Sequence, residues 1–468
     1  MRKLIIISLL FISISSCSLF RTKIVPYPTG LIFPLDVDTT ISYQGEIIDV
    51  VQEEGSNLYL STKDDFVYCL NVQQKKLVWS FQVEGELVSP VYLGRDYIYV
   101  YDKDTTLYCL KKDGNLNWKK EIKENITSGV RENEGIIYLG TEKGTLFALN
   151  DSQGKKLWAF RAGSSIYSTP IVSAGMIIFG SDDHYLYFLD EQGKLKDKFQ
   201  AGDKIRVPAL VDGNRLYFGS YDHYFYCLNL DKIKKRWRIK TGSRIGTPPI
   251  VYKKRIFFLC WNSVLYCLNK NNGSILWWQT LPSRSYYQLT LVDGKIVVTS
   301  LSSLLVCFEA KTGKRIGNYK AKQTIKSNPI WFDPFLMVNL YDYRTHQGSL
   351  VLLKKKVKVS LKPSKKSPQS IGEEIAFRAS TVGFFQPQFE FFLKEKGGEE
   401  KTVQEKSETS YWVWYPEKEG TYIIRVKATD EKEEDEAKVT YIIEKKMDQD
   451  TLNFIINLID LLIKIIGL

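Results

Sequence analysis

The stretch that decides the fold is residues 146–158, LFALNDSQGKKLW: four apolar residues, a polar turn containing Gly154, and Trp158. Comparable apolar runs end at positions 70, 110, 149, 189, 228, 268, 308 and 353. The intervals between these positions are 40, 39, 40, 39, 40, 40 and 45 residues. Such regular spacing indicates a repeated structural unit, which has to be recognised before other features are interpreted.

Each repeat predicts about four short strands. An apolar run without polar alternation is typical of a strand buried on both faces. A second apolar strand precedes the run, as at residues 136–139, and a Trp and a Ser/Thr-Pro step follow it, as at Trp158 and Thr169-Pro170. A closed ring covers both faces of every blade and leaves no long sheet edge free. We therefore predict an all-β fold with an eight-bladed β-propeller over residues 38–357.

The polar turn resembles that of PQQ-type repeats, whose pattern is Leu-Asp-x-x-x-Gly-x-x-x-Trp. Residues 149–158 (LNDSQGKKLW) and 268–277 (LNKNNGSILW) match it with Asn in place of Asp, and the Trp-Asp dipeptide of WD40 repeats does not occur. The last unit lacks its Trp, whereas residues 41–46 (ISYQGE) look like the segment that begins at Trp79. We expect residues 38–44 to supply the outer strand of the last blade and to close the ring.

The cysteines after Cys17 occupy a packing position and do not form a disulfide pattern. One slot of the repeat holds Ala148, Phe188 and Leu352 in three units and Cys in the other five: Cys69, Cys109, Cys227, Cys267 and Cys307. A small apolar packing role explains all eight occupants, whereas a disulfide explains only some. We predict buried free thiols, with Cys260 unpaired as well.

The N-terminus predicts export and lipidation. Arg2 and Lys3 precede an apolar run over residues 4–14, too short to span a bilayer but typical of a signal peptide. Ile14-Ser15-Ser16-Cys17 resembles a bacterial lipobox. We expect residues 1–16 to be removed, Cys17 to be lipidated, and residues 17–37 to form a tether. Ser18 resembles the signal for the outer membrane, which places the protein in the envelope facing the periplasm.

The chain changes character after the ring. Seven Lys and no acidic residue lie in residues 354–366, and we interpret residues 358–370 as a basic linker, with contact to anionic lipid as the alternative. Apolar–polar alternation over residues 371–445 predicts a small Ig-like β-sandwich, which also resembles triple-tyrosine modules. Residues 446–468 predict an amphipathic helix. Contact with a membrane interface, with a helix bundle or with its own domain are all open.

Composition excludes a collagen, a disordered chain and a multi-span membrane protein, because 44% of residues are hydrophobic and 25% are charged. With only 3 His there is little material for a His-based site, although a net charge of +12 suits an anionic partner. We interpret Asp182-Asp183-His184 and Asp222-His223 as turns, with metal binding as the alternative.

Two surfaces are candidate binding sites. Lys204, Arg244 and Arg284 precede the inner strands of three successive units and are expected to line a channel mouth and bind an anion. The longer 341–346 loop accounts for the 45-residue interval and is expected to project and bind a partner. Its candidate contact residues are Tyr341, Tyr343, Arg344 and His346.

The lipobox and the PQQ-like ring together resemble the BamB family of outer-membrane assembly lipoproteins. That resemblance implies a non-catalytic scaffold without cofactor, metal or nucleic acid. It would bind an envelope protein through rim loops and the membrane through Cys17. The Ig-like module and the C-terminal helix are departures from that family, and the amphipathic pattern alone makes the helix a candidate for a second membrane contact. Two alternatives remain open: a glycan- or anion-sensing lipoprotein, and a divergent quinoprotein dehydrogenase. Against the latter, no Cys-Cys dipeptide occurs.

Overall fold

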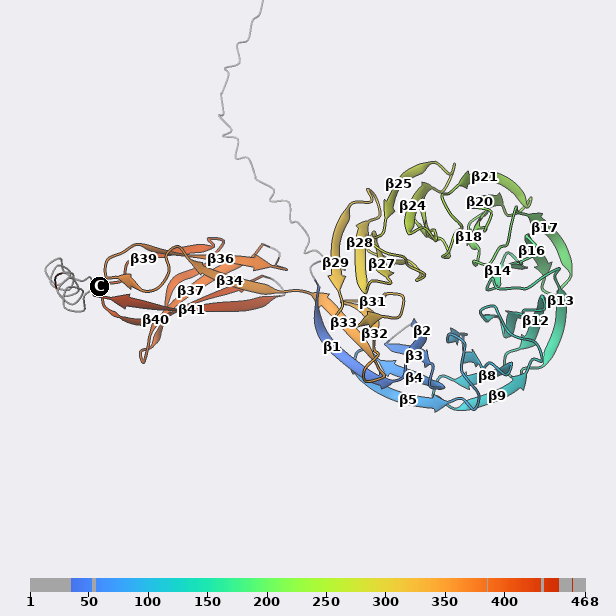
Figure 1. Cartoon of the computed structure of the whole chain (residues 1–468), viewed down its shortest axis with the longest axis horizontal. Helices are drawn as coiled ribbons and strands as arrows, with labels where there is room; N and C mark the ends of the chain where they lie inside the picture. Colours follow the sequence, from blue (N-terminus) through green and yellow to red (C-terminus); the bar gives the residue numbers. More distant parts are fainter. Residues whose placement is uncertain (1–34, 53–55, 385, 431–432, 446–456, 458–468) are drawn as a thin grey trace, which may run out of the picture.

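The computed structural model describes residues 35–445, apart from 53–55, 385 and 431–432, together with residue 457. Every regular element between residues 35 and 445 is a strand, so the predicted all-β fold is confirmed for this part of the chain. Strands β1–β33 form a ring of sheets, and β34–β41 form two further sheets beside it (Figure 1).

Seven sheets of the ring each contain four antiparallel strands that follow one another in the chain. The first two are β2 (Ile47–Gln52), β3 (Asn57–Thr62), β4 (Phe66–Asn71) and β5 (Lys76–Gln82), then β6 (Tyr92–Leu93), β7 (Tyr97–Tyr101), β8 (Thr106–Lys111) and β9 (Leu116–Glu121). The third and fourth are β10 (Arg131–Asn133), β11 (Ile136–Gly140), β12 (Thr145–Asn150) and β13 (Lys156–Arg161), then β14 (Ile171–Ser173), β15 (Met176–Gly180), β16 (Tyr185–Asp190) and β17 (Leu195–Gln200). The fifth is β18 (Leu210–Asp212), β19 (Arg215–Gly219), β20 (Tyr224–Asn229) and β21 (Lys234–Lys240). The sixth and seventh are β22 (Ile250–Tyr252), β23 (Arg255–Leu259), β24 (Val264–Asn269) and β25 (Ile275–Thr280), then β26 (Thr290–Val292), β27 (Lys295–Ser300), β28 (Leu304–Glu309) and β29 (Arg315–Lys320).

The last sheet of the ring joins residues from both ends of the repeat region. It contains β30 (Thr324–Ile325), β31 (Ile330–Phe332), β32 (Phe335–Asp342) and β33 (Gln347–Lys355), and β1 (Leu35–Gln44) completes it by pairing antiparallel with β33. The prediction that residues 38–44 supply the outer strand is therefore confirmed. The segments just before neighbouring first strands are also connected: the Ser168 hydroxyl donates to the Val207 carbonyl at 3.3 Å.

The hydrophobic core lies between neighbouring sheets of the ring. Tyr59 and Cys69 of the first sheet, for example, pack against Ile98 and Tyr108 of the second. The apolar runs form the third strands, whose central residues are buried on both faces. All six described cysteines are buried, as the packing interpretation predicts, and none of them forms a disulfide with another described cysteine. Each sheet therefore depends on its neighbours to keep its apolar side chains from water.

Five outer strands carry a tryptophan that is held by the next sheet. The indole N–H of Trp118 donates to the Asp151 carbonyl at 2.7 Å. Gly154, at φ 66°, lies under the same indole, and a Cβ there would come within 2.9 Å of the ring. The same arrangement recurs at Trp79 with Gly114, Trp158 with Gly193, Trp237 with Gly273 and Trp277 with Gly313. The Gly and Trp of one repeat therefore serve two different sheet–sheet contacts.

This contact predicts a large cost for a side chain at Gly154. Gly154→Val should lower the free energy of unfolding by about 2–4 kcal/mol, because the positive φ and the Trp118 ring both oppose it. Gly213→Val is the matched control, since Gly213 also has positive φ (57°) but a Cβ there would meet nothing within 4 Å. Urea denaturation should show the larger loss for Gly154→Val, and equal losses would contradict the contact.

Strands β34–β41 form a small sandwich. One sheet has the order β34 (Lys358–Pro363), β36 (Ile375–Val382) and β39 (Tyr411–Trp414). The other has the order β35 (Gln369–Ser370), β41 (Glu434–Glu444), β40 (Gly420–Thr429), β37 (Gln388–Glu395) and β38 (Glu400–Ser407). Phe377, Trp414 and Tyr441 lie in the core between them. Lys355 at the end of the ring pairs with Glu433 at 3.1 Å, which joins the last ring strand to the sandwich.

The predicted basic linker over residues 358–370 is wrong, because that segment supplies β34 and β35. Val359 is buried and Leu361 packs against the sandwich core, while Lys358 and Lys362 alternate with them and face water. The number of lysines had concealed this alternation. The ring strands also begin at Leu35 and end at Lys355 rather than at 38 and 357.

Several predicted features lie outside the described residues: the signal peptide over 1–16, Cys17 with the tether as far as residue 34, and the C-terminal helix over 446–468 with the exception of residue 457. Within the described part, no helix has the length and apolar character needed to cross a bilayer.

Candidate functional site

One end of the ring is built from two kinds of loop, and we call it the hairpin face. The hairpins between second and third strands hydrogen-bond to the connections that lead from an outer strand to the next first strand. Tyr221 N–H donates to the Lys204 carbonyl at 2.9 Å, and Trp261 N–H donates to the Arg244 carbonyl at 3.0 Å. Side chains from neighbouring repeats are thereby brought together at this face.

The predicted anion-binding residues lie on the hairpin face, where each has different neighbours. Lys204 lies 3.7 Å from Asp182, Arg244 stacks on aromatic rings, and Arg284 is exposed. None of the three is among the described residues that line the cavity at the centre of the ring. Their binding of an anion at the channel mouth therefore stays a prediction.

A continuous row of arginine and aromatic side chains crosses the hairpin face. Arg206 lies 4.2 Å from the Tyr167 ring centre and 5.6 Å from that of Tyr221. Arg244 continues the row, 5.0 Å from Tyr221 and 4.2 Å from Trp261. Tyr286 ends it, with its ring 5.9 Å from Trp261. We call these residues the arginine–aromatic row: Tyr167, Arg206, Tyr221, Arg244, Trp261 and Tyr286.

The two arginines of the row differ in their charge partners. Arg206 donates from Nε and Nη2 to the two carboxylate oxygens of Asp182, at 2.8 and 2.6 Å. That bidentate bond raises the pKa of Arg206 further above its usual value. Arg244 makes no ion pair with any described carboxylate, and its guanidinium lies over the rings of Tyr221 and Trp261. Its guanidinium N–H groups can therefore bind an external carboxylate or other anion.

The row is also accessible from solvent. Trp261 is 37% exposed and Tyr286 51% exposed, although large aromatic side chains are usually covered. Gly246 makes room for Trp261, because a Cβ there would lie 2.3 Å from the indole Cδ1. The backbone of one connection thus sets the position of the ring that stacks on Arg244.

Gly246 gives a direct test of that positioning. Gly246→Ala should displace the Trp261 ring from Arg244, since the exposed indole can move more easily than the backbone. The indole N–H resonance of Trp261, assigned with Trp261→Phe, should shift strongly. Gly242→Ala on the same connection is the control, because its nearest neighbour is the movable Asn262 amide. An unchanged resonance in Gly246→Ala would show that Gly246 does not set the position of the ring.

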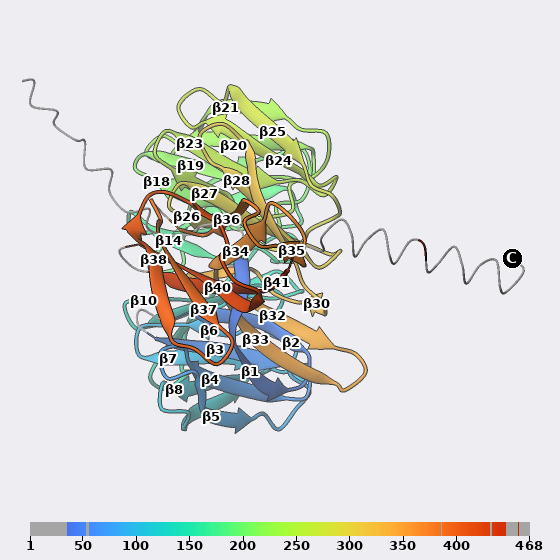
Figure 2. The ribbon, with the colours of Figure 1, turned by 90° about the vertical axis from the view of Figure 1, so that its left-hand side faces the viewer.

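The 341–346 loop is a structured hairpin tip that projects beyond its neighbours (Figure 2). The Tyr341 hydroxyl lies 3.1 Å from His346 Nδ1, and the Tyr341 ring packs edge-on to Tyr343 at 4.9 Å. Tyr341 is buried, so it supports the tip, whereas Tyr343, Arg344 and His346 are exposed. The structure therefore places the four predicted residues on one hairpin tip and leaves three of them accessible.

Lys326 connects this tip to the start of the ring. Its ammonium group pairs with Glu46 at 2.8 Å and lies 5.0 Å from the Tyr343 ring centre. Burial opposes the charged form, but the bonds to Glu46 and Tyr343 prevail and raise the pKa of Lys326.

The two Asp-His motifs are turns, as the sequence indicates. His184 and His223 have φ values of 76° and 68°. Asp183 accepts hydrogen bonds from the Tyr187 hydroxyl at 2.5 Å and from Gly163 N–H at 2.8 Å. In the described part of the chain, no three His, Cys, Asp or Glu side chains lie close enough to hold a metal ion.

Sequence reasoning missed most of the row, although a signal was present. Tyr167, Arg206, Gly246 and Tyr286 fill one slot of the repeat, and Asp182, Tyr221, Trp261 and Leu301 fill another. Residues that differ from repeat to repeat at one slot mark positions that the fold does not dictate. The two slots become neighbours only when the loops are folded over one another.

Comparison with known proteins identifies the ring. A family model described as "Outer membrane protein assembly factor BamB" matches residues 42–123, 104–203 and 262–331. The structure of BamB from Moraxella catarrhalis superposes with a TM-score of 0.59 at 14% identity, covering 69% of this chain and 100% of that one. Residues 35–355 form a BamB-like PQQ-repeat propeller.

The matching segments in curated relatives are short. BamB of Nitrosomonas eutropha is 33% identical over 102 residues, 22% of this chain and 24% of the relative. The beta-alanine-activating enzyme of Mus musculus is 28% identical over 100 residues, 20% of this chain and 9% of the enzyme. The alignment spans about a quarter of the BamB relative. It therefore supports the likeness of the propeller repeats, and it does not extend the activity of the whole relative to this chain.

Proposed function

We propose that this BamB-like propeller is an eight-bladed, non-catalytic scaffold that docks a protein of the cell envelope during outer-membrane protein assembly. The observation that carries the proposal is the arginine–aromatic row, in which Arg244 lies over two aromatic rings and has no described carboxylate partner. The match to proteins named as assembly factors supports the setting.

The chemistry of the row suits a protein surface. Stacked rings offer large apolar contact area at low cost in conformational entropy, and arginine adds directed bonds to carboxylates. The expected partner segment therefore carries an acidic side chain beside aromatic or aliphatic ones. Tyr343 and Arg344 on the projecting hairpin are proposed as an additional contact on the same face.

Affinity capture from solubilised envelopes tests this function. The wild-type protein should recover components of the barrel-assembly machinery, and Trp261→Ala and Arg244→Glu should each reduce recovery about tenfold or more, as expected for central interface residues. Trp278→Ala is the matched control, because Trp278 is 58% exposed but lies on the outer strand β25. Equal recovery by all variants would refute the role of the row. Retention on glycan without these components would favour the sensing alternative.

We propose that a lipid on Cys17 attaches the protein to the membrane. We further propose that residues 358–444 are an Ig-like module and that the C-terminal segment is a helix. Cys17→Ser should move the protein from the membrane fraction of the native host to the soluble fraction after fractionation. Continued membrane association in that variant would assign attachment to another part of the chain.

A calcium-bound quinone does not fit the described channel lining. Its carboxylates are those of Asp49 and Glu132, and both Glu132 oxygens already accept backbone bonds, from Arg95 and Gly135. A single available carboxylate is a poor donor set for Ca²⁺, which takes six to eight oxygens. We therefore derive no redox step for this protein.

A further inference from the structure

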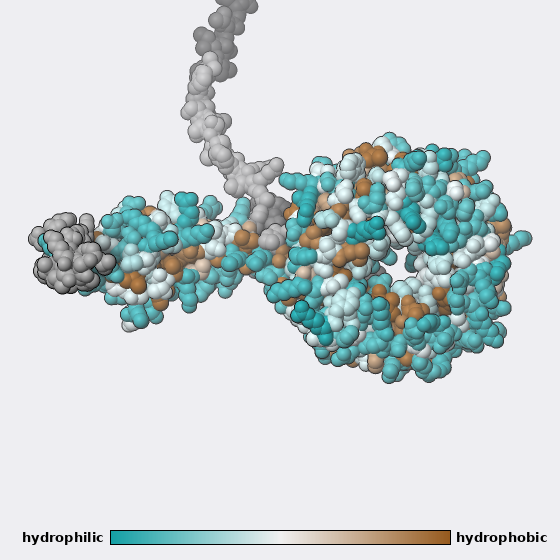
Figure 3. All heavy atoms as spheres, viewed as in Figure 1, coloured by the Kyte–Doolittle hydropathy of each residue, from teal (hydrophilic) through white to brown (hydrophobic). Residues whose placement is uncertain are grey.

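The ring is hollow at its centre, and the hollow is a cavity of about 830 Å³. The space-filling view shows the opening (Figure 3). All eight sheets of the ring, or the segments just before their first strands, contribute to its lining. The volume lies within the range usual for small-molecule sites.

One negative side chain enters the cavity without a compensating cation. Asp49 on β2 is partly buried where it lines the cavity, and its described hydrogen bond is from the Val50 N–H at 2.8 Å. Burial raises the pKa of Asp49 to about 6, despite that bond. A partly buried carboxylate without a cationic partner in the described chain costs free energy when charged, and a cation that enters the cavity would offset that cost.

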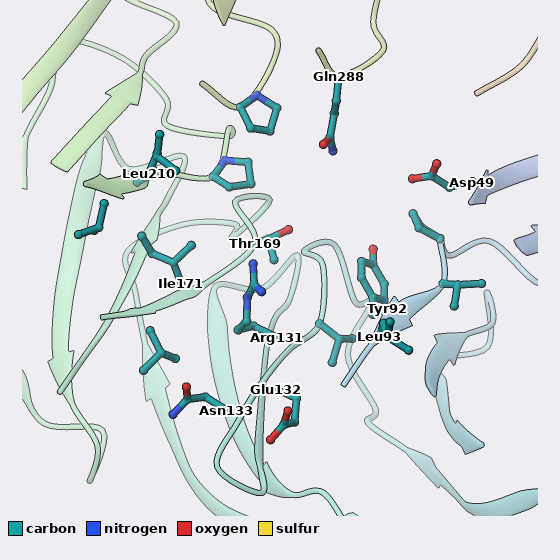
Figure 4. A pocket seen from close by; sticks show the side chains of 18 of the residues that line it. Asp49, Tyr92, Leu93, Arg131, Glu132, Asn133, Thr169, Ile171, Leu210 and Gln288 are labelled. Atoms are coloured by element: carbon teal, nitrogen blue, oxygen red, sulfur yellow. The ribbon is translucent and has the colours of Figure 1, made fainter. Parts of the chain in front are cut away.

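One positive side chain enters the same cavity without a compensating anion. Arg131 on β10 is exposed to the channel and makes no ion pair with any described carboxylate. Its neighbour Glu132 is engaged with backbone N–H groups. Figure 4 shows Asp49 and Arg131 reaching into the cavity from different sheets.

The other residues that line the cavity provide polar groups and an apolar surface. The Gln288 amide points into the cavity, and the Tyr92 ring is fixed by stacking on Tyr101 at 6.2 Å. Pro208 and Pro248 contribute rigid apolar wall. The amide oxygen of Gln288 is a further acceptor on the cavity wall, and aliphatic groups of a ligand would meet the proline rings.

We propose that the central cavity binds a small zwitterion, an amino acid or short peptide with free ends, through Asp49 and Arg131. The ligand's ammonium group pairs with Asp49 and its carboxylate with the Arg131 guanidinium. One such ligand neutralises both unpaired charges, which a simple cation or anion cannot do. This site is separate from the arginine–aromatic row and does not depend on the proposed assembly function.

Titration calorimetry with trialanine and its blocked derivatives tests the site. Trialanine should bind, while N-acetyl-trialanine and trialanine amide should each bind about tenfold or more weakly, because each lacks one charge-assisted bond. Asp49→Asn should remove the preference for a free amine, and Arg131→Gln should remove the preference for a free carboxylate. Asp104→Asn and Arg344→Gln, both at exposed hairpins, are the matched controls and should bind like the wild type.

The outcomes separate clearly. Absence of trialanine binding at millimolar concentration would overturn the proposal, as would equal affinity for the blocked peptides. Unchanged preferences in Asp49→Asn and Arg131→Gln would also overturn it. Thermal melts of each variant establish that it is folded, and Arg131→Gln tests the site independently of Asp49. If the Trp261→Ala variant lost partner capture but still bound trialanine, the peptide-binding inference would be unaffected. If trialanine binding were absent while partner capture was intact, the scaffold function would be unaffected.

Discussion

Tyr43→Ala should lower the free energy of unfolding by about 3–5 kcal/mol, as for other large buried side chains cut back to alanine. Tyr43 lies on β1, the strand that closes the ring, and only 6% of its surface is exposed. Its hydroxyl donates to Asn339 Oδ1 at 2.9 Å, and its ring packs on Tyr68 at 5.9 Å. The position opposite is Gly348, where a Cβ would come 2.1 Å from the ring. Truncation therefore leaves a cavity across three strands and an unsatisfied buried amide oxygen.

The effect can be apportioned with two further variants. Tyr43→Phe should cost about 1–3 kcal/mol, because it keeps the ring and removes only the bond to the buried Asn339. Tyr343→Ala is the matched control, since Tyr343 is 55% exposed on the hairpin face. Urea denaturation followed by tryptophan fluorescence measures all three. If Tyr43→Ala and Tyr343→Ala unfolded at the same urea concentration, β1 would not be the strand on which ring closure depends.

Asp49→Asn should raise the free energy of unfolding at pH 7 by up to about 3 kcal/mol, a stabilisation by removal of a charge. The pKa of Asp49 in the folded protein is about 6, above the ordinary value of 3.8, so the folded state holds the proton more tightly than the unfolded chain. This carboxyl therefore costs nothing below pH 3.8. Stability is lost as the pH rises from about 4 to 6, and the full penalty is present above pH 6.

The variant should consequently diverge from the wild type only above about pH 4. Thermal melts between pH 3.5 and 8 should give equal melting temperatures at the acidic end and a higher value for Asp49→Asn at neutral pH. Asp104→Asn, on an exposed hairpin, should follow the wild type throughout. A constant difference at every pH would assign the stabilisation to packing and not to the carboxylate. Trialanine should narrow the neutral-pH difference, because it binds the folded wild type.

The repetitive part of the fold was accessible from the sequence because its determinants are local. Each apolar run lies in a strand of a different sheet, and the likeness of residues 41–46 to the segment beginning at Trp79 located the closing strand. The turn at His184 was likewise predictable from residue type. In each case, one stretch of chain carries the whole signal.

Features formed by several separate stretches of the chain could not be predicted from the sequence. The arginine–aromatic row is formed by loops of different repeats, and the sequence around Arg206 gives no local sign of its ring contacts. The Asp49–Arg131 cavity needs the ring to be closed before the two charges face one space. The linker prediction for residues 358–370 was wrong for another reason. The high lysine content is typical of a linker, but Val359 and Leu361 alternate with polar residues as in a strand.

The antiparallel pairing of β1 with β33 has a mechanical consequence. Leu35 and Lys355 face each other at one end of this ladder, so the chain enters and leaves the ring at adjacent points. A pull between the segment before residue 35 and the sandwich would load the β1–β33 bonds one after another, as in peeling, and not all at once, as in shear. The ring should therefore open under modest tension at this seam while the other sheets stay intact.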